Sequence, residues 1–375
     1  SCCAEAAYSV DARPNRKVLR PIFGYLSDPR SAVRRQAELS AVAILEKAQE
    51  DSQTLAFASQ QLTQMLQNAS NTDKKAEEIP AQRAVSLLRA TAPLIPDQQL
   101  GDIFVALTKL PALLGQHPCC TAAFDFAAEH LTPQKPWEEE MAEAPPNAEL
   151  AARFLPGLLE VPLSMLNVAY VAAFVRAIAA AVAQLCGKEA LPSLPLKLAA
   201  TKKILSLFSE QDPGLLRAAG KACSTIFSAA GETEDDALLQ DLLETLRPLL
   251  RFEVKGSWCF ALPAVGALFD ALDSRRSQLD LAALQQWDPA TFQRAKPLVI
   301  ELIEVRDKSR PGELNVYGKE LQEAIASAIK TFGPQQVLRS MPLEVLQHPL
   351  TDVQFEQKSR SWMLLVLKDS CQRTA

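Results

Sequence analysis

Two amphipathic helical patterns, joined by a tight turn, occupy residues 18–45. Apolar side chains recur there at intervals of three and four residues, the spacing that gathers them on one face of a helix. One such helix pair cannot bury both apolar faces by itself, whereas stacked copies can, so the feature favours a chain of repeated pairs. The apolar positions are Val18, Leu19, Ile22, Tyr25 and Leu26 in the first helix, and Val33, Ala37, Ala41, Ile44 and Leu45 in the second.

The turn between the two patterns is Asp28-Pro29. Proline disfavours helical geometry at the residue before it, so the first helix should end here, with Asp28 capping the second helix and Pro29 in its first position. The order of an apolar helix, Asp-Pro and then Val-Arg-x-x-Ala resembles the consensus of a HEAT repeat. In such repeats the arginine, here Arg34, pairs with an aspartate of its own repeat or the next. The resemblance therefore implies structural roles for Asp28 and Arg34.

A second periodic signal supports repetition along the chain. Proline directly before a leucine-rich turn recurs at intervals of about 46 residues, or twice that, which lies within the range of HEAT and armadillo repeats. These prolines are Pro111, Pro156, Pro248 and Pro297, with Pro263 out of register. Only 6% of the 375 residues are aromatic and 13 are glycine, whereas sheets are usually richer in both. The sequence therefore predicts an all-α fold, an α-α superhelix of the HEAT/armadillo solenoid type.

We expect four segments along the chain. Residues 132–147 are rich in proline and glutamate and predict an exposed acidic loop. A solvated excursion between repeats is the favoured interpretation of this loop, and a domain boundary or a partner-binding loop is the alternative. The segments are HEAT-like repeats at 1–131, the acidic proline-rich loop at 132–147, HEAT-like repeats at 148–332, and a turn, a loop and the start of a truncated repeat at 333–375. Because the sequence runs from Ser1 to Ala375, where it stops within an apolar pattern, we expect a fragment of a larger protein.

The most apolar stretch of the sequence is residues 163–186. Its length approaches that of a membrane span, but Asn167, Arg176 and Gln184 interrupt it. Polar and charged side chains are costly inside a bilayer, so we expect a buried central helix rather than a membrane-spanning one.

Residues suited to catalysis or to metal binding are sparse. The one cluster of metal-ligand type is His117, Cys119, Cys120 and His130. Adjacent cysteines cannot easily both bind a tetrahedral metal, so we expect ordinary packing there. The sequence has no glycine-rich phosphate loop, nucleophile elbow or HExxH helix. It therefore predicts no enzyme activity, metal, cofactor or small-molecule substrate, and the eight cysteines are expected to be reduced thiols.

Basic residues crowd the first repeat, although the whole chain carries a net charge of −5. A local basic patch can contact phosphates despite that net charge if the fold aligns its members. The other interpretation, that these residues are scattered charges exposed to solvent, is the favoured one. The candidates for contact with RNA or a partner are Arg13, Arg16, Lys17, Arg20, Arg30 and Arg35, and further basic residues follow at Lys202, Lys203, Arg275, Arg276, Arg294 and Lys296.

The C-terminal third carries a more specific resemblance. Phe332-Gly333-Pro334-Gln335-Gln336-Val337-Leu338 is followed by Met341-Pro342-Leu343-Glu344 and then by Arg360-Ser361-Trp362-Met363-Leu364-Leu365. This order, with Leu250-Arg251-Phe252 and Trp258 upstream, resembles the ribosomal RNA-processing protein 12 family, although Leu365 stands where that family usually has proline. The resemblance implies architectural roles, as a turn for Gly333 and Pro334 and as packing anchors for Trp258 and Trp362.

The same resemblance implies a non-enzymatic HEAT-repeat scaffold of ribosome biogenesis, acting in pre-rRNA processing, small-subunit precursor assembly and nuclear export. The implied partners are pre-ribosomal particles, through both protein and pre-rRNA, and the nuclear-transport GTPase machinery, with no membrane. The implied location is the nucleus and nucleolus, with shuttling to the cytoplasm. An importin/exportin-type nuclear transport receptor is the alternative, because it shares HEAT architecture and binds a transport GTPase directly.

Overall fold

The computed structural model describes residues 16–49, 51–69, 74–132, 147–163, 167–186, 194–231, 236–343 and 360–372. All regular secondary structure in these ranges is helical. The chain divides into two compact units, unit 1 (Ser1–Gln184) and unit 2 (Leu185–Ala375), and each is described by itself. This division falls inside the repeat segment predicted at 148–332, and the acidic loop predicted at 132–147 lies almost wholly outside the described residues.

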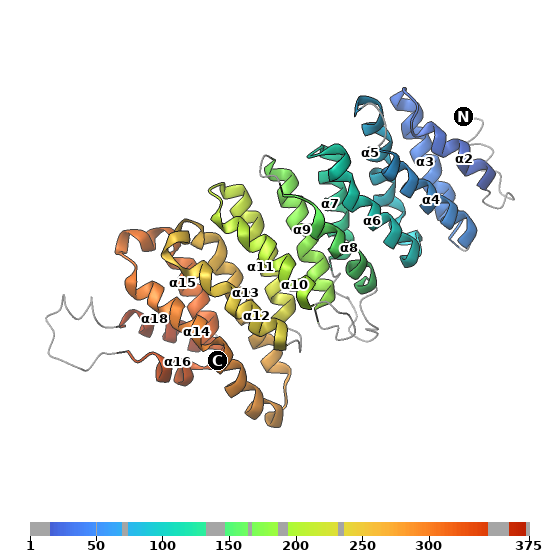
Figure 1. Ribbon diagram of the computed structural model, residues 1–375. Helices are drawn as coiled ribbons and strands as arrows, with labels where there is room; N and C mark the ends of the chain where they lie inside the picture. Colours follow the sequence, from blue (N-terminus) through green and yellow to red (C-terminus); the bar gives the residue numbers. More distant parts are fainter. Residues whose placement is uncertain are drawn as a thin grey trace, which may run out of the picture. The chain divides into compact units, whose positions relative to one another are not determined.

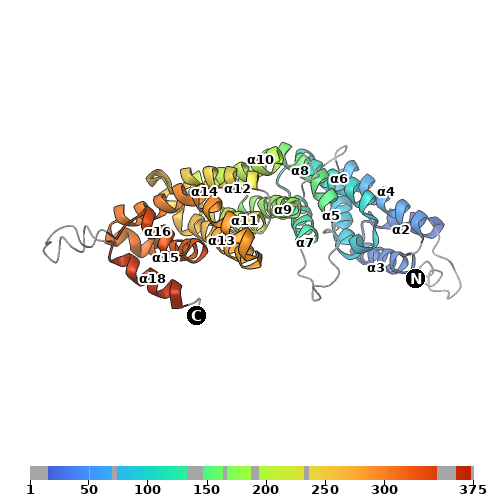
Figure 2. The same cartoon turned by 90° about the horizontal axis from the view of Figure 1, so that it is seen from below.

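Unit 1 is built from helix pairs stacked in two layers (Figure 1, Figure 2). Within a layer each helix packs on the helix two places further along the chain. In this way α4 (Ser52–Asn68) packs on α6 (Asp97–Leu114), and α5 (Lys74–Thr91) packs on α7 (Pro118–Leu131). Aromatic rings continue the second layer, because Phe124 of α7 contacts Tyr170 and Phe174 of α9 with centroids 5.7 and 5.3 Å apart. The first layer contains α2 (Arg16–Tyr25), α4 (Ser52–Asn68), α6 (Asp97–Leu114) and α8 (Ala148–Glu160). The second contains α3 (Ser31–Lys47), α5 (Lys74–Thr91) with η1 (Ala92–Leu94), α7 (Pro118–Leu131) and α9 (Val168–Leu185).

Unit 2 repeats the arrangement, with α12 packed between α10 and α14 and α13 between α11 and α15. The first layer contains α10 (Leu194–Leu205) with η2 (Ser206–Ser209), α12 (Asp236–Leu246) with η3 (Arg247–Leu250), α14 (Leu281–Lys308) and α16 (Pro334–Ser340). The second contains α11 (Pro213–Gly231), η4 (Phe252–Ser257), α13 (Trp258–Gln278), α15 (Pro311–Phe332) and α18 (Trp362–Gln372). Helix pairs stacked in two layers confirm the predicted all-α solenoid (Figure 2).

The α11–α13 interface in unit 2 depends on two glycines. A Cβ atom at Gly220 would overlap the carbonyl oxygen of Phe260, which belongs to the α13 backbone. A Cβ atom at Gly231 would lie 2.7 Å from the Cβ atom of Ala271. Because protein interiors pack closely and backbone cannot yield as a flexible side chain can, these two positions set how closely the helices approach.

Helix α9 is the one described helix with the length and apolarity of a membrane span, and 72% of that stretch is buried inside the protein. Its polar side chains have protein partners in unit 1. Gln184 Nε2 donates to the Leu131 carbonyl at 2.7 Å, and Arg176 forms an ion pair with Asp125 of α7. These contacts agree with the predicted central helix.

Ion pairs join successive helices within the layers. Ion pairs at the protein surface typically contribute about 0.2–1 kcal/mol each, and these pairs range from exposed to partly buried, so they align neighbouring repeats more than they stabilise the fold. In the second layer of unit 1 they link α3 to α5, α5 to α7 and α7 to α9 through Glu38–Arg83, Glu129–Arg89 and Asp125–Arg176. In unit 2, Asp273 of α13 pairs with Lys330 of α15 at 2.7 Å.

The Asp28-Pro29 junction differs from its prediction. Helix α3 begins at Ser31 after Arg30, whose side chain makes no capping hydrogen bond. Asp28 does not cap α3, because its carboxylate accepts from the backbone N–H and the guanidinium of Arg30. The predicted geometry occurs instead at Asp212, which accepts from Gly214 N and Leu215 N beside Pro213, the first residue of α11.

The predicted inner face of α2 is wrong at one position. Tyr25 is 45% exposed, whereas Phe23 is buried. The buried residues Leu19, Ile22, Phe23 and Leu26 follow a spacing of three, four and seven, and Tyr25 falls outside it.

The periodic prolines all lie in the first layer of their unit. Pro111 and Pro156 are inside α6 and α8, Pro297 is inside α14, and Pro248 is in η3. Pro263 is in α13, a second-layer helix, which explains why it departs from the register of the others.

Substitution of Gly220 by alanine tests the close approach of α11 and α13. We expect Gly220→Ala to lower the free energy of unfolding by about 1–3 kcal/mol, because the new methyl group must push the α13 backbone away. Urea denaturation followed by circular dichroism measures the change. Gly312→Ala is the matched control, because nothing lies within 4 Å of a Cβ there and the variant should be neutral or more stable. Equal stability of the two variants would contradict the expectation.

Candidate functional site

The basic residues predicted to contact RNA or a partner lie near the start of unit 1. Arg13 is outside the described residues, and Arg16 is the first residue of α2. Lys17 and Arg20 on α2 and Arg35 on α3 are exposed. Their contact with RNA or a partner stays a prediction.

Arg30, the sixth of these candidates, is engaged by Asp28. Its Nε and Nη2 atoms donate to the two carboxylate oxygens at 3.0 Å each, although the arginine side chain is 72% exposed. These hydrogen bonds, together with the one from the Arg30 backbone N–H, lower the pKa of Asp28 to about 2. The charge of Arg30 is therefore largely compensated within its own turn.

The side chain of Arg34 contacts the backbone of the same turn. Its Nη1 atom donates to the carbonyl oxygens of Asp28 and Pro29 at 2.7 and 2.8 Å. The pairing expected from the repeat consensus was with an aspartate carboxylate, and here Arg30 occupies that carboxylate. Arg34 thus fastens the turn to α3 through carbonyl groups.

The histidine and cysteine cluster has packing and capping contacts. His117 Nδ1 accepts from Cys119 N at 3.1 Å at the start of α7, and burial raises the pKa of Cys120 to about 12. The His130 ring packs against Phe104 and Phe126 with centroids 5.8 and 5.9 Å away, and burial lowers its pKa. In the part of the chain that the structure describes, no group of three or more potential ligands could hold a metal ion.

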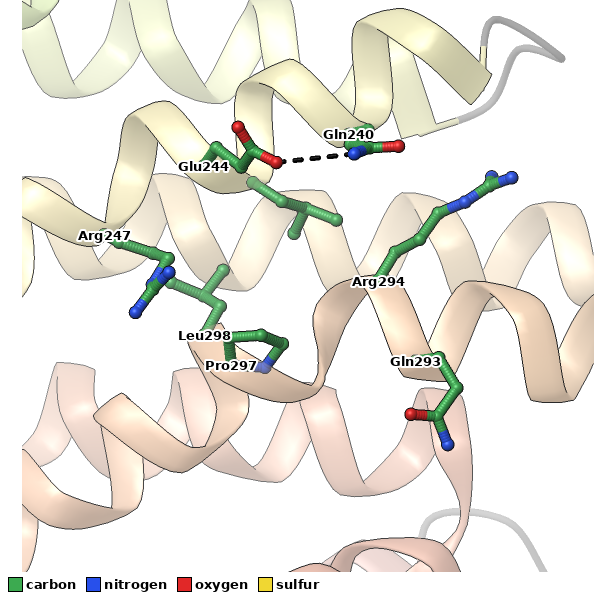
Figure 3. A pocket seen from close by; sticks show the side chains of 8 residues that line it. Gln240, Glu244, Arg247, Gln293, Arg294, Pro297 and Leu298 are labelled. Atoms are coloured by element: carbon green, nitrogen blue, oxygen red, sulfur yellow. Dashed lines mark hydrogen bonds between the residues drawn. The ribbon is translucent and has the colours of Figure 1, made fainter.

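A groove between α12 and α14 is the candidate site in unit 2 (Figure 3). It consists of two hollows of about 580 and 660 Å³ that share Glu244 and Arg247 as lining residues. The first is lined by Gln240, Leu243, Glu244 and Arg247 on one side and by Gln293, Arg294, Pro297 and Leu298 on the other. The second is lined by Glu244, Arg247, Pro248, Leu250 and Arg251 on one side and by Glu301, Glu304, Val305 and Lys308 on the other.

Two of the periodic prolines lie in the walls of this groove. Pro297 is in the interior of α14, where a proline removes a backbone hydrogen bond and bends the helix. Pro248 lies in the 3₁₀ turn η3 that follows α12. Each wall therefore contains a proline that interrupts regular α-helical hydrogen bonding beside the hollows.

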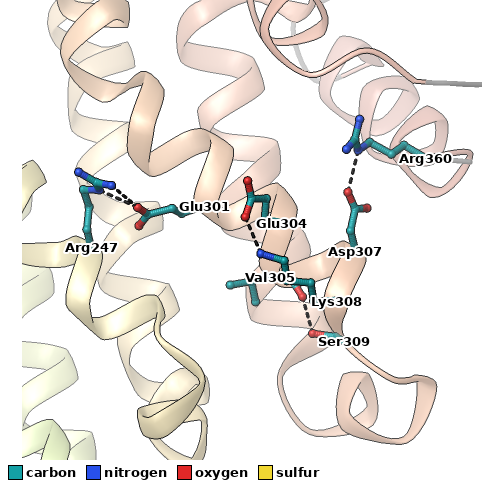
Figure 4. A network of polar contacts seen from close by, with 8 residues as sticks. All are labelled: Arg247, Glu301, Glu304, Val305, Asp307, Lys308, Ser309 and Arg360. Atoms are coloured by element: carbon teal, nitrogen blue, oxygen red, sulfur yellow. Dashed lines mark hydrogen bonds and ion pairs between the residues drawn. The ribbon is translucent and has the colours of Figure 1, made fainter. Parts of the chain in front are cut away.

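Ion pairs order the charges of the groove (Figure 4). Arg247 Nη2 lies 2.6 Å from Glu301 Oε1 and joins the two walls, which raises the pKa of Arg247. Lys308 Nζ lies 2.6 Å from Glu304 Oε2 one turn away on α14. Of the basic residues singled out in the sequence, Arg294 lines the groove, and Figure 3 shows its side chain extending away from Pro297 and Leu298.

Trp258, Gly333 and Pro334 have contacts or backbone conformations that fit the architectural roles expected of them. Trp258 is fully buried, donates from Nε1 to the Leu249 carbonyl at 2.7 Å and meets Tyr317 edge to face at 4.9 Å. Gly333 adopts a φ of +81° between α15 and α16, a conformation that favours glycine, and Pro334 begins α16.

Trp362 is held by a carboxylate that the sequence did not single out. Asp307 Oδ1 accepts from Trp362 Nε1 at 3.1 Å. Figure 4 shows the second contact, in which Asp307 Oδ2 accepts from Arg360 Nε at 2.7 Å. The Arg306 guanidinium lies 5.2 Å from the centroid of the Trp362 ring, in cation–π geometry. These contacts attach the start of α18 to the end of α14.

A family model for the HEAT repeats of ribosomal RNA-processing protein 12 matches residues 214–375. The matched residues lie within unit 2 and contain both the groove and the Asp307 contacts. No curated protein matches the chain.

The Asp28–Arg30 pair predicts a pH dependence. An unfolded aspartate titrates near pH 4, so a folded pKa of about 2 stabilises the fold above that pH, and the contribution is lost as pH falls from about 4 to about 2. Arg30→Ala should raise the pKa of Asp28 towards its ordinary value, as measured by NMR titration of the carboxyl carbon. Arg35→Ala is the control and should leave that pKa unchanged. An unaltered titration in Arg30→Ala would refute the assignment.

Removal of the Asp307 carboxylate should loosen α18. We expect Asp307→Ala to cost about 1–3 kcal/mol, because Arg360 Nε and Trp362 Nε1 both lose their acceptor. Amide hydrogen exchange should quicken in α18 while α11 and α13 stay protected. Glu304→Ala on the same helix breaks only an exposed pair with Lys308 and should stay within about 0.5 kcal/mol of the parent. Unchanged exchange in α18 would show that other contacts hold this helix.

Proposed function

We propose, from the membership of residues 214–375 in the HEAT-repeat family of ribosomal RNA-processing protein 12, that this protein is a non-enzymatic scaffold of ribosome biogenesis. The family match carries the proposal. The stacked helix pairs support it, because a solenoid offers an extended surface on which many modest contacts can add up. Its action would be in pre-rRNA processing, small-subunit precursor assembly and nuclear export, in the nucleus and nucleolus with shuttling to the cytoplasm.

A binding role, rather than catalysis, agrees with the chemistry of the two surfaces. In the α12–α14 groove, Glu301 and Glu304 are committed to ion pairs with Arg247 and Lys308. In unit 1, the exposed basic side chains of Lys17, Arg20 and Arg35 are suited to phosphate contact.

The proposed partners are pre-ribosomal particles, through both protein and pre-rRNA, with the nuclear-transport GTPase machinery as a further partner. An importin/exportin-type receptor would share the stacked helix pairs and bind the GTPase as its principal partner. The family match favours the scaffold.

Crosslinking of the full-length protein to RNA in cells, followed by sequencing, tests the proposal. We expect enrichment of pre-rRNA, and we expect Lys17→Glu, Arg20→Glu and Arg35→Glu combined to reduce it several-fold by reversing charges that would face phosphates. Lys202→Glu, Lys221→Glu and Arg339→Glu combined make the same change in charge at exposed positions of unit 2 and serve as the control. Background recovery of pre-rRNA, with a transport GTPase as the main protein partner, would favour the receptor instead.

A further inference from the structure

We infer that the α12–α14 groove binds an extended segment of a partner protein that carries one acidic and one basic side chain, three or four residues apart. This inference rests on the proposed scaffold function and names the kind of partner segment that one surface takes. The inference rests on Glu244 and Arg251, the two charged residues of the groove whose side chains are least engaged in polar contacts within the protein.

The other charges of the second hollow are paired within the protein. Glu301 is held by Arg247 and Glu304 by Lys308, at 2.6 Å in both cases. Arg251 is exposed, and within the described chain its side chain makes no hydrogen bond or ion pair. A ligand with a carboxylate can therefore reach Arg251 without breaking an existing pair.

Glu244 is the corresponding anion, exposed and shared by both hollows. Its carboxylate accepts one long hydrogen bond, from Gln240 Nε2 at 3.4 Å, and is attracted by the nearby Arg247 (Figure 3). Arg247 itself donates to Glu301, so the strongest partner near Glu244 is already engaged. A basic side chain from a ligand can pair with Glu244.

The distance between these two charges selects an extended segment. Glu244 and Arg251 are seven positions apart along α12 and η3. A rise of about 1.5 Å per residue in an α-helix and about 2.0 Å in a 3₁₀ helix places their Cα atoms roughly 10–12 Å apart along the axis. An extended chain covers that distance in three or four residues, at about 3.3 Å each.

The lining of the groove favours polypeptide over nucleic acid. Its charged residues are three glutamates and four cations, so both signs are mixed in the lining, whereas a surface that tracks a phosphate backbone is mainly basic. Leu243, Pro297 and Leu298 line the first hollow, where an apolar side chain of the segment can insert.

Fluorescence anisotropy of the full-length protein with four labelled probes tests the inference. Three are short peptides with a central leucine and a charged residue two positions to either side of it, a lysine and a glutamate, two lysines or two glutamates, so that the charges are four residues apart, and the fourth is a single-stranded oligouridine. We expect the lysine–glutamate peptide to bind about tenfold more tightly than either like-charged peptide, because each of those places a like charge beside Glu244 or Arg251. The oligouridine should show no binding that depends on the groove.

Charge reversal in the groove should redirect the preference. Arg251→Glu should favour the two-lysine peptide, and Glu244→Lys the two-glutamate peptide. Arg339→Glu, a reversal at an exposed position outside the groove lining, should leave the parent preference intact. Urea melts that match the parent would show that both groove variants fold.

Either of two results would overturn the inference. One is the absence of a preference among the peptides, or a preference that Arg251→Glu and Glu244→Lys leave unchanged. The other is binding of oligouridine that Arg251→Glu abolishes, which would assign the groove to RNA. Recovery of pre-rRNA by the full-length protein is a separate measurement, so the groove can fail while the scaffold function stands.

Discussion

Each helix pair of this protein has apolar surface that only a neighbouring pair can cover, and the rest of the structure depends on that burial. In unit 2, α13 packs on α11 through one side and on α15 through another. Fully buried side chains such as Trp258, Leu262 and Phe269 fill these contacts, and burying one large apolar side chain contributes about 1.5–3 kcal/mol. Gly220 and Gly231 let α11 approach α13 closely enough for the contact to form.

Polar contacts refine this arrangement and shape the surfaces that it exposes. Ion pairs between successive helices align neighbouring repeats, and in the α12–α14 groove the same kind of pair, Arg247–Glu301, joins the two walls. Where one carboxylate serves two donors, as Asp307 does for Arg360 and Trp362, it attaches the start of one helix to the end of another. Surface grooves thus arise between repeats, from residues of different helices.

A protein of this construction is suited to distributed recognition. The proposed scaffold would use exposed basic side chains in unit 1 and a groove of balanced charge in unit 2, two surfaces with different chemistry. The basic side chains suit phosphates, whereas the groove, whose lining mixes glutamates with basic and apolar residues, suits polypeptide. Assembly factors that hold both RNA and protein need both kinds of surface.

The sequence by itself determined the helices and their repetition, because those follow from the spacing of apolar residues and from local rules for proline and glycine. The apolar face of α2, where Leu19, Ile22 and Leu26 are buried, and the turn at Gly333 are of this kind. Only the tertiary structure decided that Arg30 occupies the Asp28 carboxylate and that Asp307 binds Arg360. It also decided that Glu244 and Arg251 face a groove. The Asp307 contact and the groove both bring together residues some fifty positions apart in the sequence, and Asp307 and Arg360 are separated by 53. Contacts at that range depend on how repeats pack, and local periodicity carries no information about it.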